Sequence, residues 1–286
     1  MNRWARRCGI FLVFLIAAAV HGAVLHTDIE YARPDGVSLK LDVISPDAPG
    51  PHPAIILVHG GAFVEGHRQG DVKHLFDPLT KLGLTVFTID YRLAPKFMYP
   101  AAVEDVEAAI RWVKANAARY QADAGRLGIL GVSAGGSLVS MAIARGKLGC
   151  EVSAVVLFYA INDVLRTFDP KQTSEKMRID RSRFYGVREV NAENESFLRA
   201  ASPYYNLRMS MPPYLLLHGT DDPRVDYPQS VAMCKKLTEM GNRCELITIA
   251  GGGHGNWKDT SWKQKLLSWL STQLGQEASR GREPAQ

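Results

Sequence analysis

The chain has 286 residues, of which 46% are hydrophobic and 22% are charged, and these values are typical of a folded globular protein. They exclude disordered, collagen-like and coiled-coil proteins. The length suits one large α/β domain with an ample hydrophobic core. The formal net charge is +5, but Arg3, Arg6 and Arg7 lie in the first 22 residues, which contain no Asp or Glu, so the remainder is nearly neutral. The sequence has no basic run interleaved with aromatic residues, and we therefore expect no nucleic acid partner.

The N-terminus has the pattern of an export signal. Three arginines precede an unbroken apolar run from Ile10 to Val20. This run is too short to span a bilayer, which requires about 20 residues. We predict a signal peptide over residues 1–22, cleaved within residues 19–23, and hence a periplasmic or secreted protein without stable membrane insertion after signal removal. An uncleaved anchor is the alternative.

The four cysteines show no metal-binding spacing. Cys8 precedes the apolar run, so it is not placed as a lipoprotein cysteine. Cys234 falls in a predicted helix and Cys244 at the start of the strand that follows. In an oxidising compartment these two residues could form a disulfide, and two buried free thiols fit the sequence equally well.

The predicted elements, in chain order, begin with a β-hairpin. The segment DIEYARPDGVSLKLDVI consists of two alternating stretches around Asp35-Gly36, a strong turn signal. Beyond it, apolar β-type runs alternate with segments of helical period. Because these runs are apolar on both faces, they predict an α/β fold with a mostly parallel, wound sheet and helices on both faces. The predicted strands are 54–60, 84–91, 126–132, 154–160, 213–219 and 244–250, and the predicted helices are 72–83, 102–120, 134–146, 226–240 and one that ends near Leu274.

Two segments depart from this alternation. Residues 161–212 have only weak helical periodicity and no clear strand. A stretch of this length inside a compact domain indicates a small inserted cap, and a plain crossover with one or two short helices is the alternative. The polar end, residues 276–286, is expected to be a disordered tail. Residues 23–275 therefore form the predicted α/β domain.

A candidate nucleophile lies between a predicted strand and a predicted helix. Residues 131–135 read Gly-Val-Ser-Ala-Gly and fit G-x-S-x-G in the strand-turn-helix context that this motif requires. A serine on such a strained turn leaves no room for Cβ atoms two residues before and two residues after it. Ser133 is therefore the predicted nucleophile.

A serine hydroxyl needs a base within hydrogen-bond reach, and His254 is the best candidate. It lies in GGGHG, just after the strand CELITIA, where a glycine-rich loop can bring an imidazole over the edge of the sheet. His59 and His218 end strands beside glycines, and a structural hydrogen-bonding role suits them. The remaining histidines of the mature chain fall on predicted surface segments: His26, His52, His67 and His74.

The acid that orients the base is expected after the strand PYLLLHG. Asp222 lies there in HGTDDPRV, and the order serine, aspartate, histidine is that of α/β-hydrolases. Its neighbour Asp221 is the second candidate, and Asp163, one strand earlier, is the third. Asp90 and Asp105 are interpreted as structural residues at a strand end and a helix start.

Backbone amides must hold the negative charge that develops on the substrate oxygen. Gly60, Gly61 and Ala62 follow the strand AIILV and offer consecutive unhindered amides. Ala134, beside the nucleophile at a helix N-terminus, offers another. An ordinary glycine turn is the alternative for the first three.

HGGA, DYRLAP, GVSAGGS, HGTDDPRV and GGGHG occur in this order, and with them the chain resembles the α/β-hydrolase superfamily. More closely, it is similar to the esterases around hormone-sensitive lipase and to the exported acetyl and feruloyl esterases of bacteria. The resemblance covers about residues 39–274. It implies a triad of Ser133, Asp222 and His254, with Gly60, Gly61, Ala62 and Ala134 around the oxyanion hole.

The chain departs from the lipase-like members in two ways. Those members usually have HGGG and an acidic residue before the serine, where this chain has Ala62 and Val132. The long N-terminal cap helices of that branch are also missing. Both departures favour the compact branch that acts on carbohydrate esters.

These observations predict a serine hydrolase of short-chain or carbohydrate-linked (acetyl or feruloyl) carboxylic esters, acting through an acyl-enzyme. Its partner would be a small-molecule or carbohydrate ester, and the chemistry requires no cofactor and no metal. Amide hydrolysis by an aryl formamidase or small peptidase of the same fold is the main alternative. A non-catalytic binding protein on a hydrolase scaffold is less favoured, because the sequence retains a candidate for every catalytic role. Phe63, Tyr91 and Tyr159 could line the pocket, although core packing suits each of them better.

Overall fold

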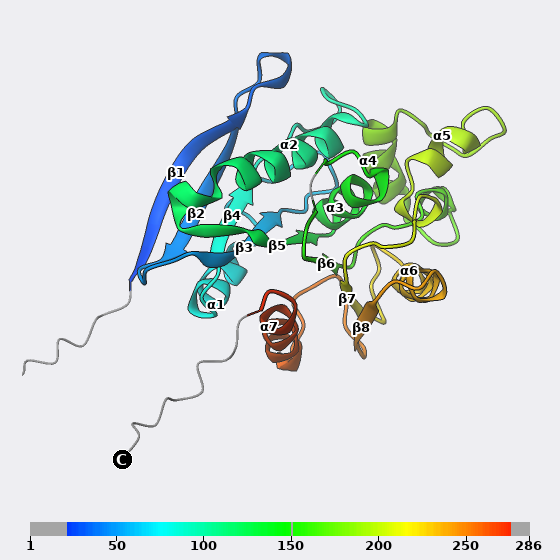
Figure 1. Cartoon of the computed structure of the whole chain (residues 1–286). Helices are drawn as coiled ribbons and strands as arrows, with labels where there is room; N and C mark the ends of the chain where they lie inside the picture. Colours follow the sequence, from blue (N-terminus) through cyan, green and yellow to red (C-terminus); the bar gives the residue numbers. More distant parts are fainter. Residues whose placement is uncertain (1–21, 150, 276–286) are drawn as a thin grey trace, which may run out of the picture.

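The computed structural model describes residues 22–149 and 151–275 (Figure 1). The predicted signal sequence up to residue 21 and the predicted tail lie outside the described residues. Within the described ranges, no helix is long and apolar enough to cross a bilayer. The same ranges contain no group of three His, Cys, Asp or Glu side chains that could hold a metal ion.

One eight-stranded sheet, ordered β1-β2-β4-β3-β5-β6-β7-β8, forms the centre of the molecule. The first two strands are antiparallel additions, and all the pairs from β4 to β8 are parallel. The predicted mostly parallel α/β sheet is confirmed. The strands are β1 (Ala23–Ala32), β2 (Leu39–Pro46), β3 (His52–Val58), β4 (Thr85–Ile89), β5 (Ala122–Val132), β6 (Ala154–Phe158), β7 (Tyr214–Gly219) and β8 (Cys244–Ile249).

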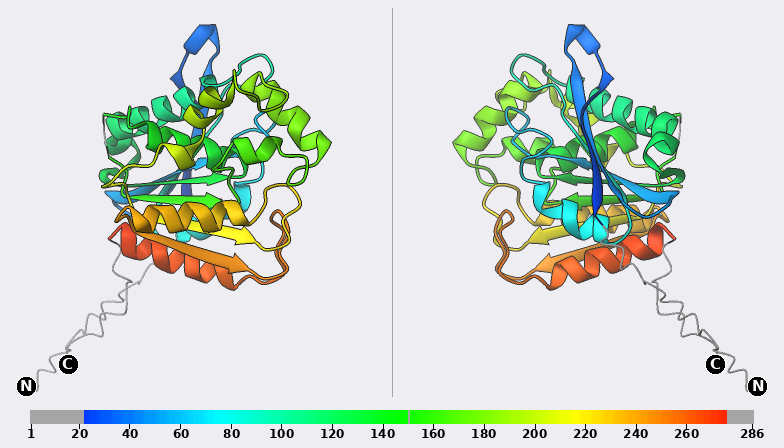
Figure 2. Two further views of the ribbon diagram at one scale, coloured as in Figure 1. Left: turned by 90° about the vertical axis from the view of Figure 1, so that its right-hand side faces the viewer. Right: turned by 90° about the vertical axis from the view of Figure 1, so that its left-hand side faces the viewer.

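The first two strands form the predicted hairpin. The pairing of β1 with β2 is antiparallel, and the connection between them carries Asp35 and Gly36 at φ values of 50° and 75°. Glycine adopts this left-handed conformation freely and aspartate tolerates it, so the Asp-Gly pair suits the turn. Figure 2 shows the tip of the hairpin extending beyond the helices.

A cluster of charges, here called the Arg68 cluster, ties the hairpin to the loop after β3. The Arg68 guanidinium donates to Asp28 of β1 at 2.6 Å, to Asp42 of β2 at 2.8 Å and to Asp90 after β4 at 2.6 Å. The side chains of Arg68 and Asp42 are only 15% and 2% exposed, so this pair is screened less by water than the pair with the exposed Asp28. Asp90 has the predicted structural role, since it also accepts the Arg68 backbone N–H.

In the described part of the chain, five α-helices cover the two faces of the sheet (Figure 1). On one face, α2 (Ala101–Asn116), α3 (Ala134–Arg145) and α6 (Pro228–Glu239) contribute to the larger apolar core. On the other, α1 (Phe76–Lys81) and α7 (Ser261–Gln273) pack through residues such as Leu79 and Leu266. The central strands between these layers are buried on both sides, which explains their unbroken apolar sequences.

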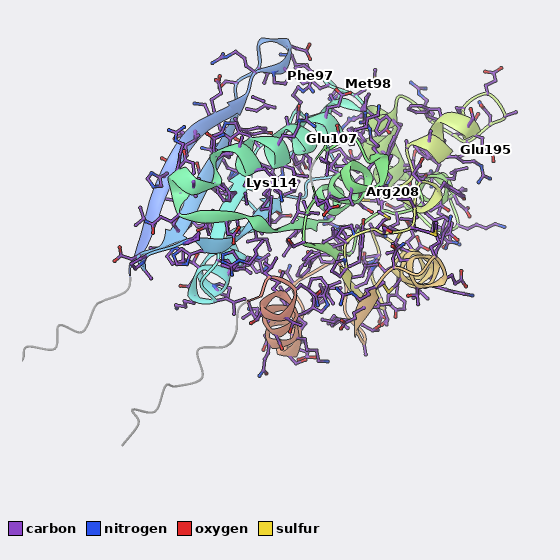
Figure 3. All side chains as sticks on the ribbon, in the orientation of Figure 1. Phe97, Met98, Glu107, Lys114, Glu195 and Arg208 are labelled. Atoms are coloured by element: carbon purple, nitrogen blue, oxygen red, sulfur yellow. A yellow bond between two sulfur atoms is a disulfide. The ribbon has the colours of Figure 1, made fainter. Side chains whose placement is uncertain are left out.

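The loop before β7 is held against α3 by hydrogen bonds. Arg208, labelled in Figure 3, lies in the loop before β7 and donates to the carbonyl oxygens of Ile143 and Ala144 at 2.7 and 3.2 Å. A cation at the C-terminus of α3 satisfies free carbonyl groups and interacts favourably with the helix dipole.

Asp105 lies within α2 rather than at its start. Its carboxylate is buried and accepts from the Arg92 guanidinium.

The segment between β6 and β7 is helical. It contains 3-10 turns at Leu165–Phe168 and Pro203–Tyr205 together with the helices α4 (Glu175–Tyr185) and α5 (Glu195–Ala200). It is anchored through an aromatic stack, in which the ring of Phe184 in α4 lies 4.2 Å from that of Phe63. The pattern of α4 is mostly charged, which accounts for its weak periodicity in the sequence.

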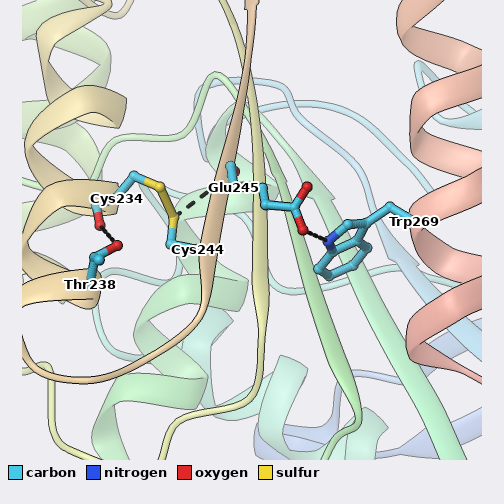
Figure 4. Close-up of a disulfide and its surroundings, with 5 residues drawn as sticks. All are labelled: Cys234, Thr238, Cys244, Glu245 and Trp269. Atoms are coloured by element: carbon cyan, nitrogen blue, oxygen red, sulfur yellow. Dashed lines mark hydrogen bonds between the residues drawn. A yellow bond between two sulfur atoms is a disulfide. The ribbon is translucent and has the colours of Figure 1, made fainter.

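A disulfide joins Cys234 of α6 to Cys244 at the start of β8 (Figure 4). Of the two arrangements that the sequence leaves open, the structure therefore contains the bonded one. On the opposite side of β8, Glu245 accepts from the indole N–H of Trp269 in α7 at 2.9 Å. The last strand is thus fastened to a helix on each face of the sheet.

Candidate active site

Ser133 lies on a sharp turn between β5 and α3. Its backbone is at φ 53° and ψ −119°, a strained conformation for a residue with a side chain. A Cβ on Gly131 would lie 2.4 Å from the Gly135 oxygen, and a Cβ on Gly135 would lie 2.3 Å from the Val58 oxygen. The crowding expected from G-x-S-x-G is therefore present, and it exposes the serine above the sheet edge.

The three residues proposed as a triad come together at the carboxyl ends of β5, β7 and β8. Ser133 Oγ lies 2.9 Å from Nε2 of His254, and Nδ1 of His254 lies 2.7 Å from Oδ2 of Asp222. In the neutral imidazole, the Nδ1–H donates to the carboxylate and Nε2 accepts from the serine hydroxyl. This arrangement can remove a proton from the serine as the serine attacks.

The Asp222 carboxylate is fully buried and saturated with donors. Its Oδ1 accepts the backbone N–H groups of Arg224 and Val225 at 2.8 and 3.1 Å. Burial acts to raise the pKa of Asp222, but hydrogen bonds from His218 and His254 outweigh burial and hold this pKa well below its ordinary value. The group is therefore a permanent anion beside the base at neutral pH.

His218 contacts the acid, a role that the sequence does not reveal. Its Nε2 lies 3.2 Å from Oδ2 of Asp222 and 2.9 Å from the Val225 oxygen, while its Nδ1 lies 2.7 Å from Oγ of Ser230. Two acceptors around Nε2 require a proton there, so Nδ1 accepts from the serine. His218 therefore has the predicted structural hydrogen-bonding role, and one of its partners is the candidate acid Asp222. The signal available in the sequence is the spacing of four residues between His218 and Asp222.

The other acidic candidates do not reach His254. Asp221 is exposed and accepts from the hydroxyl of Thr220 at 2.9 Å. Asp163 accepts the N–H of Leu165 and the hydroxyl of Tyr205. Burial raises the pKa of Asp163 above its ordinary value, whereas the pKa of Asp222 lies below that value.

The loop after β3 brings the expected amides toward Ser133, with one difference from the prediction. The Gly60 N–H donates to both oxygens of Asp71 at 3.2 and 3.1 Å, so this amide is engaged. Gly61 and Ala62 have φ values of 110° and 52°, and neither their N–H groups nor that of Ala134 has a partner among the described residues. These three amides remain candidates for the oxyanion hole, and Asp71 supports the loop.

His59 and Tyr91 hold the same loop from below. Their rings stack at 4.2 Å, and the Tyr91 hydroxyl donates to the carbonyl oxygens of His59 and Gly60. Tyr91 is buried and takes the core position favoured by the sequence. The loop is therefore rigidly supported, as a preorganised oxyanion hole requires.

A cavity of about 1190 Å³ opens over Ser133 and His254. One wall is aromatic: the ring centroids of Trp257 and Trp262 lie 5.5 Å apart, and the Tyr159 ring lies 4.3 Å from His254. The lining also includes charged side chains of α4, namely Lys176, Asp180 and Arg181. A site with one apolar wall and a few polar groups is typical of small-molecule binding. Phe63 and Tyr159 also line the cavity. Both are largely buried, in agreement with the core packing that the sequence favours for them.

The sheet order, the serine turn and the position of the site at the carboxyl ends of the strands define an α/β-hydrolase. Within this class, the chain belongs to the BD-FAE family, whose model matches residues 41–237.

Similar curated proteins and solved structures are named as ester hydrolases or esterases. The probable carboxylic ester hydrolase LipM of Mycobacterium tuberculosis is 30% identical over 238 residues, 80% of this chain and 52% of that protein. The chain thus spans about half the length of the first curated relatives it matches. A propionate-bound esterase from Thermogutta terrifontis is 25% identical, with a TM-score of 0.72 over 91% of this chain and 97% of that one. A carbohydrate esterase from gut microbiota, 24% identical with a TM-score of 0.75 over 88% and 96% of the two chains, shares the fold.

Proposed function

We propose that this protein is a carboxylic ester hydrolase with a serine nucleophile. The observation that carries the proposal is the hydrogen-bonded series Ser133, His254 and Asp222 at the floor of an open cavity. The names of the relatives LipM and the Thermogutta terrifontis esterase support an ester as the bond that is broken.

In the proposed reaction, Ser133 Oγ attacks the acyl carbon while His254 takes the hydroxyl proton at Nε2. The imidazolium then returns this proton to the departing alcohol, which leaves an acyl-enzyme on Ser133. Water, deprotonated by the same nitrogen, attacks the acyl-enzyme and releases the acid. The buried Asp222 anion stabilises the imidazolium in both halves of the reaction and keeps the Nδ1 proton in place.

The negative oxygen of each tetrahedral intermediate would be held by the free amides of Gly61, Ala62 and Ala134. Each such donor contributes about 2.7–4 kcal/mol in systems where it has been removed. Because Asp71 engages the Gly60 amide, its carboxylate fixes the loop instead of contacting the substrate oxygen.

The proposed substrates are short-chain esters or esters linked to carbohydrate. The three aromatic residues in the cavity lining, Tyr159, Trp257 and Trp262, support this class, since flat rings suit sugar and aryl groups. The name of the carbohydrate esterase from gut microbiota points in the same direction. Export through the predicted signal peptide is part of the proposal, and the disulfide supports it because such bonds persist in oxidising compartments.

The test compares the protein with its Ser133→Ala variant on p-nitrophenyl acetate, butyrate and octanoate and on an acetylated xylan oligosaccharide. We expect hydrolysis of the short esters, and a loss of at least about a thousandfold in the variant. Ser268→Ala in α7, an exposed serine, is the matched control and should retain full activity. If the wild type cleaves no ester while Ser133 still reacts with a fluorophosphonate, the ester proposal is wrong and amide substrates are the next candidates.

A further inference from the structure

Arg181 is a buried cation in the wall of the cavity. It lies in α4 and lines the same cavity as Ser133 and His254, yet its residue is only 4% exposed. Arginine is rarely buried to this degree unless its charge is paired, because removing the guanidinium from water is costly. Its position therefore requires an explanation.

No side chain among the described residues forms a direct ion pair with this charge. Nη2 of Arg181 donates to the backbone oxygen of Arg224 at 2.8 Å, whereas Nη1 is buried without any hydrogen-bond partner among the described residues. Among the residues that the structure describes, no carboxylate oxygen lies within 4.0 Å of the Arg181 guanidinium. Burial lowers the pKa of Arg181 to about 10, so the group remains a cation at neutral pH.

The acidic residues nearest in the fold are committed to other partners. Asp180 faces Lys176 at 3.1 Å and Arg183 at 3.4 Å. Asp226 pairs with Arg166, and Asp222 is held by the two histidines. Among the described residues, no acid is thus left to pair with Arg181, and we look for its partner in a bound molecule.

A second cation lies next to Arg181 at the cavity wall. The Arg224 residue is exposed, lines the cavity, and has no ion pair within the described residues. The cavity lining also includes the acids Glu65 and Asp71 of the loop after β3, and Asp71 is engaged by the Gly60 amide. The two arginines add positive charge to the lining next to the loop that carries Asp222.

We propose that Arg181, assisted by Arg224, binds a carboxylate carried by the substrate, so that the preferred substrates are esters with a free acid group. This inference rests on the proposed ester hydrolase function. A guanidinium matches a carboxylate with two parallel hydrogen bonds, and Nη1 supplies a donor that has no other use. Because Nη1 is closed to solvent in the free protein, a small rotation of the guanidinium toward the cavity accompanies binding.

The carboxylate could belong to the acyl group or to the alcohol, and two substrate pairs distinguish these sources. The acyl pair is the p-nitrophenyl monoester of adipic acid and its neutral amide analogue. The alcohol pair is p-acetoxybenzoate and p-acetoxybenzamide. The readout is the ratio of kcat/KM for the acid over that for its amide, because a general loss of activity cancels in this ratio.

We expect the wild type to prefer the acid in one of the two pairs. In Arg181→Gln, which keeps a side-chain donor for the Arg224 oxygen, the ratio should fall about tenfold to a hundredfold, as expected for a buried hydrogen bond to a charged group. Arg181→Lys should retain part of the preference. Arg188→Gln removes an exposed charge that does not line the cavity, and this control should leave the ratio unchanged.

Other outcomes would overturn the inference. If Arg181→Gln lowers kcat/KM equally for acid and amide, Arg181 only braces the loop that carries Asp222. If the wild type cleaves both members of each pair equally well, the substrate is not an acid, while the ester hydrolase proposal stands. If it cleaves none of the four, nor any p-nitrophenyl ester, then the proposed function itself has failed.

Discussion

The edge of the parallel sheet and the helical segment between β6 and β7 contribute to the site in different ways. The sheet edge carries the proposed serine, acid and base, each on a short loop after a strand of the sheet, β5, β7 or β8. The helical segment contributes charged side chains of α4 to the cavity lining. The proposed reacting groups thus stand on the sheet, and the side chains proposed to face a substrate stand on a helical segment outside it.

This difference teaches how one scaffold can serve many substrates. Parallel strands fix the relative positions of their ends to within a hydrogen-bond length, which the chemistry requires. A helix docked by a few aromatic contacts can change its charged residues without disturbing the strands. We therefore expect substitutions at the sheet edge to affect the rate of reaction, and substitutions in α4 to affect the choice of substrate.

The largest effect is expected at the sheet edge, from Asp222→Asn. The amide cannot stabilise the imidazolium and favours the wrong tautomer of His254, so kcat should fall by about ten-thousandfold. The rate of p-nitrophenyl acetate hydrolysis measures this. Asp221→Asn, at the exposed neighbouring position, should change the rate less than about threefold, and a larger loss there would reverse the assignment of the two acids.

The same variant gives a pH-dependent stability. Because the pKa of Asp222 is depressed in the folded protein, its ionised form stabilises the fold above the ordinary Asp value and loses this contribution as the pH falls through the folded value. The difference in free energy of unfolding between wild type and Asp222→Asn should therefore shrink as the pH falls below about pH 4. Urea unfolding at several pH values measures it, and a difference that grows below about pH 4 would contradict the depressed pKa.

The core of the sheet and the surface of the helical segment should differ in stability. Leu57 in β3 is fully buried, so Leu57→Ala should lower the free energy of unfolding by about 2–5 kcal/mol. Phe197 in α5 is 38% exposed, and Phe197→Ala should cost at most about 1 kcal/mol. Urea unfolding of both variants provides the comparison. Equal losses would mean that the helical segment is as tightly integrated as the sheet.

A smaller effect is expected from the disulfide, which closes a loop with a sequence separation of 10. Replacing Cys234 and Cys244 together by serine should lower the free energy of unfolding by roughly 2–3 kcal/mol, mainly by giving the unfolded chain more freedom. Activity on p-nitrophenyl acetate at room temperature should remain, because the bond lies away from the cavity lining. Wild-type protein with a reducing agent should reproduce the loss, and an unchanged stability would contradict a bonded pair.

The sequence predicts the sheet and the sharp turn at Ser133 well because their signals are local. Apolar runs define the parallel strands, and the two glycines around Ser133 are required by backbone contacts that allow no Cβ. The candidates Ser133 and Asp222 each lie within hydrogen-bond distance of the third candidate, His254, since parallel strands bring their carboxyl ends to one edge.

Other features of the site could not be predicted because they depend on contacts between distant loops. The bond from the Gly60 amide to Asp71 depends on how residues 60–71 fold back on themselves. The proximity of His218 to Asp222 depends on the turn between them. The burial of Arg181 depends on how α4 docks, and a charged helix gives no periodic signal for its docking.

The Arg68 cluster also bears on protein engineering and on evolution. The loop that presents the candidate oxyanion amides is held by a guanidinium whose three carboxylates come from β1, β2 and the end of β4. Transplanting this loop into another hydrolase without those carboxylates would leave a partly buried cation unpaired. The loop and the N-terminal hairpin therefore depend on one another structurally. We expect the residues at positions 28, 42, 68 and 90 to covary among sequences of this family.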